Sequence, residues 1–255
     1  MAAVRQMFDG YDTGVLMADE YVGRLMNDLA DLGIADDTVI MISSDHGETL
    51  GELNVYGDHQ TADQITTRVP LILRWPGKLK AGRFDAMHYQ IDVTATLLEL
   101  LGQQVPASWD GESFASSLLA EQDSGRDSLV VSQAAWACQR GVRFADWLYL
   151  HTRHDAYHLY PDEMLFDLKS DPHQQHNVLA ENASAVEQGR NLLAGWRGDM
   201  LAQAAGAGDP HDNVMAEGGP YHVRGQLPAY LQRLRETQRT ELADRLEAKW
   251  LTGGG

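Results

Sequence analysis

The chain has 255 residues, of which 44% are hydrophobic and 22% are charged, and its 37 acidic and 20 basic residues give a formal net charge of −17. This length and composition are typical of a globular protein with one or two domains. The acidic surplus argues against nucleic acid or a membrane surface as a partner, because both attract Lys and Arg, and no apolar run reaches the length of a membrane span. The single cysteine, Cys138, cannot form an intrachain disulfide, so the compartment stays open, with bacterial cytoplasm and periplasm both compatible.

The first 125 residues predict helices alternating with buried strands. Apolar residues recur every three or four positions over 11–32, which predicts an amphipathic helix. Residues 38–43 are apolar and rich in β-branched side chains, as expected for a strand buried on both faces of a parallel sheet. A second buried strand is predicted at 70–75 and a short helix at 92–101. This order indicates a layered α/β fold.

The chain turns polar at about 121–127, which places a predicted domain boundary between 1–125 and 126–255. Segments 128–133, 143–152 and 164–168 predict strands of an antiparallel sheet, and 182–204 predicts a helix. Residues 205–227 are rich in Gly, Pro and Asp and predict a long loop, followed by one charged helix over 227–251. The three glycines at 253–255 are expected to be disordered. The second domain is therefore expected to be a smaller α+β unit.

The strand predicted at 38–43 ends in Ser44-Asp45-His46-Gly47. In open α/β sheets, ligands bind beyond the carboxyl ends of the strands. Asp45 and His46 offer a carboxylate oxygen and an imidazole nitrogen side by side, which predicts half of a divalent-metal site. The alternative is a polar turn in which Asp45 caps the next segment.

The order of motifs along the chain resembles that of the sulfatase family of the alkaline-phosphatase superfamily, and the likeness runs from about residue 8 to at least residue 180. The motifs that carry it are, in chain order, Asp45-His46-Gly47, the polar loop Tyr56-Gly57-Asp58-His59-Gln60-Thr61, Arg68-Val69-Pro70 with Trp75-Pro76-Gly77, Asp92-Val93-Thr94-Ala95-Thr96-Leu97-Leu98, Asp110-Gly111-Glu112-Ser113, and Leu165-Phe166-Asp167-Leu168 with Asp171-Pro172. The resemblance implies part of a layered α/β/α core with a smaller C-terminal subdomain.

The resemblance also implies roles for particular residues. Asp45 and His46 match the family's late metal-ligand pair, so the expected cofactor is a divalent metal, with Ca²⁺ first and Mn²⁺ or Mg²⁺ as alternatives. His59 stands where the family often carries a Lys or His that touches the sulfate or the leaving oxygen, and a protonated imidazole can act there as a general acid. Arg68 is expected to contact the anion or to form a structural salt bridge.

Downstream, the loop containing His222 and Arg224 has a composition suited to contacts with the substrate, a sulfated sugar or small molecule. A linker between helices is the alternative reading of that loop.

The family nucleophile is absent from this sequence. Sulfatases use a formylglycine made from a Cys or Ser in a Cys/Ser-x-Pro/Ala-x-Arg motif, and Cys138 is followed by Gln139-Arg140-Gly141, which does not fit. The chain therefore resembles the C-terminal portion of a sulfatase, with the formylglycine expected in a missing N-terminal half. It is expected to be inactive alone and to associate with that half or with a second copy.

Two other functions stay open. One is a phosphoesterase or phosphonate monoester hydrolase of the same superfamily, and the other is a non-catalytic metal-binding or interaction module.

Overall fold

The computed structural model describes residues 2–252, which form two compact units. The first unit comprises the chain up to His46 together with Val69–Leu129, and the second comprises Gly47–Arg68 and the chain from Val130 onward. Gly47–Arg68 thus belongs with the C-terminal sheet, although the predicted division at 125/126 grouped it with the N-terminal elements. None of the described helices is long and apolar enough to cross a membrane.

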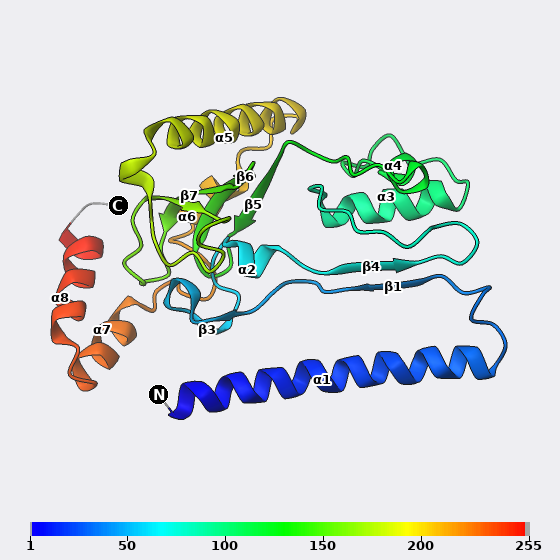
Figure 1. Cartoon of the computed structure of the whole chain (residues 1–255). Helices are drawn as coiled ribbons and strands as arrows, with labels where there is room; N and C mark the ends of the chain where they lie inside the picture. Colours follow the sequence, from blue (N-terminus) through cyan, green and yellow to red (C-terminus); the bar gives the residue numbers. More distant parts are fainter. Residues whose placement is uncertain (1, 253–255) are drawn as a thin grey trace. The chain divides into compact units, whose positions relative to one another are not determined.

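The first unit contains α1 (Ala2–Asp31), β1 (Ile40–Ser43), β4 (Leu71–Arg74), α3 (Gln90–Leu100) and α4 (Ala115–Ala120) (Figure 1). Strands β1 and β4 are antiparallel, with Ile40 opposite Arg74 and Ser43 opposite Leu71. The expectation of a doubly buried parallel strand was wrong, since Met41 is 46% exposed. The physical reason is that, within residues 2–252, this sheet consists of the two strands alone.

Helix α1 is longer than the 11–32 segment predicted from periodicity, and none of its described residues is buried. Its exposed apolar side chains include Val15, Leu16, Met17, Tyr21 and Leu25. A soluble helix normally buries such a stripe against a neighbour. The first unit therefore presents apolar surface that its described elements leave uncovered.

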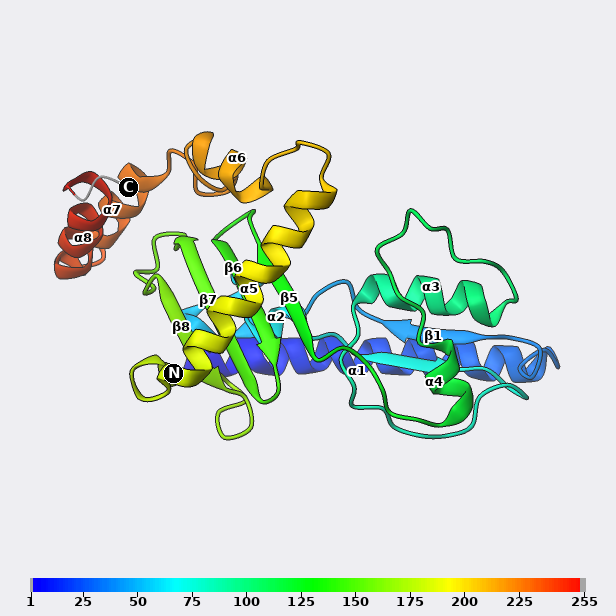
Figure 2. The ribbon, with the colours of Figure 1, turned by 90° about the horizontal axis from the view of Figure 1, so that it is seen from above.

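The second unit is built on a four-stranded sheet with the order β5 (Ser128–Gln133), β6 (Cys138–Phe144), β7 (Trp147–His154) and β8 (Glu163–Asp167). The strand predicted at 143–152 is in fact divided between β6 and β7, because the chain turns at Ala145, whose φ is 43°. Helix α5 (Ala183–Gln203) follows a short 3₁₀ turn, η2 (Leu179–Glu181), and lies across one face of the sheet (Figure 2).

Strand β7 places successive side chains on opposite faces of this sheet, as the pleat requires. Tyr149 packs in the cluster under α5, where a Cβ on Gly189 would come within 2.7 Å of it. Leu148 and Leu150 pack on the other face against Ala62. That second face carries β2 (Thr49–Leu50), η1 (Glu52–Asn54), β3 (Tyr56–Asp58) and α2 (Gln64–Thr67). The loop that contains His59 is thus anchored on the four-stranded sheet.

The C-terminal part differs from its prediction. The segment expected to be a loop contains α6 (Pro210–Ala216), which begins where the Asp209 side chain accepts the backbone N–H of His211. The single helix expected over 227–251 is divided into α7 (Leu227–Glu236), α8 (Thr240–Glu247) and a π-helical turn, Ala248–Thr252. The break lies at Gln238, with φ 60°, and allows Leu231 to pack against Leu246. The three glycines at 253–255 lie outside the described residues.

Candidate functional site

Asp45 and His46 lie side by side after the end of β1. Asp45 Oδ1 accepts the backbone N–H of His46 at 3.0 Å, and Asp45 Oδ2 lies 3.9 Å from His46 Nε2. The His46 hydrogen bond is the main reason that the pKa of the Asp45 carboxyl is lowered, so it is ionised near neutral pH. A carboxylate and an imidazole are therefore adjacent in a polar turn, and both predicted readings of this motif are compatible with the geometry.

Gly47 fixes the direction of the chain after this pair. Its N–H donates to the carbonyl oxygen of Thr66 at 2.8 Å, and a Cβ built at this position would lie 1.8 Å from the carbonyl oxygen of Ile65. Any residue with a side chain would have to shift this backbone. The requirement explains a glycine directly after Asp45-His46.

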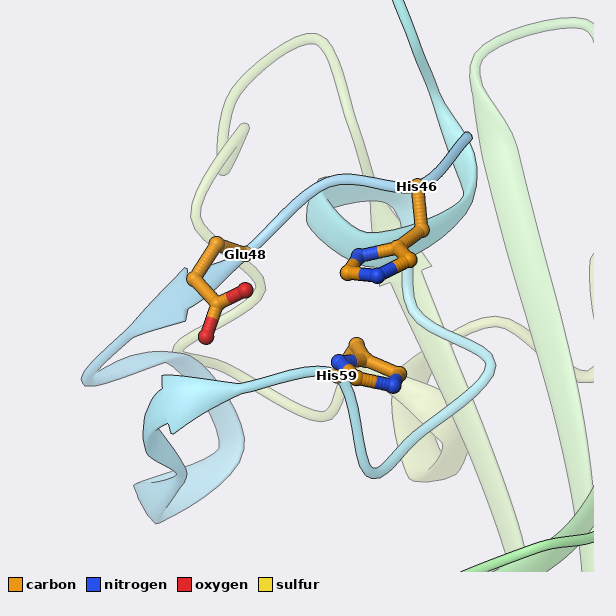
Figure 3. A group of neighbouring side chains, drawn as sticks. All are labelled: His46, Glu48 and His59. Atoms are coloured by element: carbon orange, nitrogen blue, oxygen red, sulfur yellow. The ribbon is translucent and has the colours of Figure 1, made fainter. Parts of the chain in front are cut away.

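A hairpin places Glu48 near His59. Strands β2 and β3 pair with Thr49 opposite Asp58, so the residue before β2 and the residue after β3 are neighbours. His46 is separated from Glu48 by Gly47 alone. His46, Glu48 and His59 can each offer one ligand atom, and these atoms lie within 4.8 Å of one another (Figure 3). Two imidazoles and one carboxylate are a donor set that suits Mn²⁺ or Zn²⁺ better than Ca²⁺, which prefers oxygen. No motif in the sequence indicates Glu48 as a candidate ligand, because its proximity to His59 depends on a two-residue strand.

A chain of hydrogen bonds leads from His59 into the interior. The His59 backbone N–H donates to Asp58 Oδ1 at 2.7 Å, and His59 Nδ1 lies 3.4 Å from the same oxygen. Gln60 Nε2 donates to Asp58 Oδ2 at 2.9 Å. Because the Gln60 amide nitrogen donates to Asp58, the amide oxygen points to His158, and His158 Nε2, 2.8 Å away, carries the proton. Burial lowers the pKa of His158, which favours this neutral form.

Two glutamine side chains fasten the His59 loop to the sheet. Gln139 is fully buried, accepts the Ala62 backbone N–H at 3.1 Å and donates to Thr152 Oγ1 at 3.0 Å. Gln133 donates from Nε2 to the His59 carbonyl oxygen at 2.7 Å. These bonds hold the loop in one conformation and position the His59 side chain.

The three predicted substrate-contacting residues occupy different surroundings. Arg68 is exposed at the end of α2. Arg224 donates to the Gly219 carbonyl oxygen at 3.0 Å and to Glu217 at 2.7 Å, which ties its guanidinium to its own loop. His222 stacks on Trp136 with ring centroids 4.5 Å apart. Their roles toward a substrate stay predictions.

Cys138 is buried at the start of β6, and burial raises the pKa of its thiol to about 11. A thiol of this kind is protonated and unreactive at neutral pH. The geometry thus agrees with the interpretation of Cys138 as a packing residue.

The comparisons with known proteins agree with the motif order. Residues 2–103 match the family model described as Sulfatase. An N-acetylglucosamine-6-O-sulfatase of Bacteroides thetaiotaomicron is 30% identical over 198 residues, covering 72% of this chain and 34% of the relative. The solved structure of BT4656 with D-glucosamine-2-N,6-O-disulfate is 28% identical, with a TM-score of 0.62 over 72% of this chain and 38% of the other.

A further structural neighbour is a phosphonate monoester hydrolase, SpPMH, from Silicibacter pomeroyi, which is 27% identical, with a TM-score of 0.57 over 77% of this chain and 40% of the other. These findings define a mixed α/β protein with an alkaline-phosphatase-like fold. Residues 2–103 therefore form a sulfatase-like region, and the similarity to sulfatases extends over 72% of the chain. It spans between 34% and 40% of the length of the first curated relatives that it matches.

Proposed function

We propose that this chain is the C-terminal portion of a sulfuric-ester hydrolase and contributes half of its divalent-metal site. The observation that carries the proposal is that the ionised Asp45 carboxylate lies next to the His46 imidazole beyond β1, inside the region that matches the sulfatase model. The Asp45 carboxylate suits Ca²⁺ and Mn²⁺ alike, whereas the His46 imidazole suits Ca²⁺ less well, because Ca²⁺ prefers oxygen ligands. When bound, the cation neutralises sulfate oxygens and orients the group for attack.

Within this proposal His59 donates a proton to the leaving oxygen. Its ring faces the Asp58 carboxylate at 3.4 Å, and that carboxylate is oriented by Gln60. A histidine ring held in this way can act as a general acid in its protonated form. Arg68, His222 and Arg224 are the proposed contacts to the substrate, for which a sulfated sugar is supported by the names of the relatives.

The nucleophile of this proposal, a formylglycine, lies in a further part of the sulfatase domain. Two observations support this: the chain spans about a third of its relatives' length, and the apolar residues of α1 are exposed. That further part is the proposed partner of the α1 surface, with a second copy of this chain as the alternative. The chain alone is proposed to be inactive.

Phosphonate or phosphate ester hydrolysis is the second candidate, favoured by the likeness to SpPMH. A non-catalytic metal-binding module is the third. Assays with three substrates distinguish these candidates: 4-nitrophenyl sulfate, 4-nitrophenyl phosphate and phenyl 4-nitrophenyl phosphonate. Each substrate is tested with the chain alone and with the chain co-expressed with the amino-terminal region of a sulfatase relative.

The proposal expects no turnover by the chain alone, and sulfate turnover in the complemented sample that Asp45→Ala removes. Turnover of 4-nitrophenyl sulfate by the chain alone contradicts the assignment as an incomplete enzyme. Preference for the phosphonate or phosphate in the complemented sample contradicts the sulfatase assignment and selects the second candidate.

A further inference from the structure

Three aromatic side chains lie beside the His59 loop in the second unit, and we name Trp136, Tyr221 and His222 the aromatic ledge. The segment after β5 connects them to the loop. Gln133 donates from its side chain to the His59 carbonyl oxygen at 2.7 Å, and the His222 backbone N–H donates to the Ala135 carbonyl oxygen at 3.0 Å. The ledge is therefore held next to His59 by two short connections.

The rings of the ledge are arranged against one another. Trp136 and His222 stack at a centroid distance of 4.5 Å with 22° between their planes. Tyr221 meets the His222 ring edge to face, at 5.2 Å and 79°. Tyr221 is nonetheless 78% exposed. The ledge thus offers solvent a set of aromatic surfaces whose polar edges carry hydrogen-bonding groups.

The backbone beneath the ledge is fixed before any ligand arrives. Val223 is fully buried, and its carbonyl oxygen accepts the Tyr157 hydroxyl at 3.1 Å. Arg224 closes the loop by donating to the Gly219 carbonyl oxygen and to Glu217. A preformed surface loses little conformational freedom on binding, which favours its use as a recognition site.

We propose that the aromatic ledge binds one face of a pyranose ring and so determines the sugar specificity of the site at His59; this inference rests on the proposed function. A pyranose has an apolar C–H face and a rim of hydroxyl groups, and amphipathic aromatic side chains match both. The ledge itself has no acidic or guanidinium group, so it recognises the uncharged part of the substrate. The sulfate group is left to the His59 side of the site.

The test is a set of NMR titrations of the whole chain with N-acetylglucosamine 6-sulfate, N-acetylglucosamine, sodium sulfate and phenyl sulfate. Both sugars should shift the Trp136 indole and Tyr221 ring signals, and sodium sulfate should shift the His59 signals while leaving the ledge unchanged. Tyr221→Ala and Trp136→Ala should each weaken sugar binding about three- to tenfold and leave the sulfate response intact. Trp109→Ala removes a 43% exposed indole from the first unit and should change neither response.

The two proposals fail in different ways. Absence of sugar-induced shifts at the ledge, or a preference for phenyl sulfate over both sugars, overturns the ledge. Unchanged sugar affinity in Tyr221→Ala, the exposed position whose replacement leaves the core intact, also overturns it. Sugar shifts at the ledge without any sulfate response at His59 support the ledge and contradict the proposed function, which places the sulfate ester beside His59.

Discussion

Replacing the buried Asp209 by alanine should destabilise the second unit more than replacing an exposed charged residue by alanine. Asp209 is 4% exposed and accepts two hydrogen bonds from Arg140, at 2.7 and 2.8 Å, and one from Arg197 at 2.6 Å. It also accepts the His211 N–H at the start of α6. The Arg140 contact is the main reason that the pKa of this carboxyl lies far below its ordinary value. One side chain thus joins β6, α5 and α6.

The size of the effect follows from burial. Removing one partner of a buried ion pair typically costs about 3–5 kcal/mol, because the remaining charge is left without compensation. Arg140 is only 11% exposed, although its guanidinium also lies 5.1 Å from the Trp196 ring, which retains part of the stabilisation. Loss of the helix cap adds about 1 kcal/mol. We therefore expect a loss of about 3–5 kcal/mol in the free energy of unfolding.

The assay is urea unfolding at pH 7 followed by circular dichroism, with Asp212→Ala as the matched control. Asp212 contacts Arg153 and Arg197 but is 49% exposed, so its removal should cost about 0–1 kcal/mol. At a typical slope of about 2 kcal/mol per molar urea, the Asp209 variant should unfold about 2 M earlier. Equal unfolding midpoints for the two variants would refute the reasoning that burial decides the cost.

Three further predictions concern single side chains. The pKa of Glu163 is lowered from 4.5 to about 2, chiefly by hydrogen bonds from Arg190, so the stabilisation that Glu163 provides is complete above pH 4.5 and is lost as the pH falls toward 2. The difference in urea midpoint between wild type and Glu163→Gln should therefore shrink between pH 4.5 and pH 2, and a constant difference contradicts this prediction. Gln139→Leu removes the acceptor of the Ala62 N–H, so hydrogen exchange at Ala62 should accelerate at least tenfold, and unchanged protection contradicts the anchoring role. Cys138 should resist iodoacetamide at pH 8 until urea unfolds the chain; rapid modification of the native protein would show that the thiol is accessible.

Periodicity and motif order predicted much of the fold. The strand at Ser128–Gln133 and the helix Ala183–Gln203 agree with the predicted segments within a residue, because both have a strong local pattern. The division of the C-terminal helix was missed because it depends on a single left-handed residue, Gln238, in a charged sequence. Helix α6 was also missed. It is only seven residues long and follows a Gly-rich stretch, so only Asp209-Pro210, at its start, indicates a helix in the sequence.

The candidate site was predictable only in part, for the same kind of reason. Asp45 and His46 are consecutive, so their adjacency follows from the sequence. The approach of Glu48 to His59 depends on the short β2–β3 hairpin, which is not predicted by any alternation of hydrophobic and polar residues in the sequence. The contact of Gln60 with His158 joins positions 98 residues apart, and no single-sequence pattern reports it.

An NMR titration of the chain with Ca²⁺ and, as a paramagnetic probe, Mn²⁺ decides whether Asp45 and His46 hold a cation. We expect weak binding, with a dissociation constant of about 1 mM or higher for half of a site. Mn²⁺ should broaden the Asp45 and His46 signals, and Asp45→Ala should remove both the binding and the broadening. Glu48→Gln is the matched control, because it tests the donor set of Figure 3 that excludes Asp45. Binding that survives Asp45→Ala but is lost in Glu48→Gln would contradict the central claim that Asp45 and His46 hold the cation.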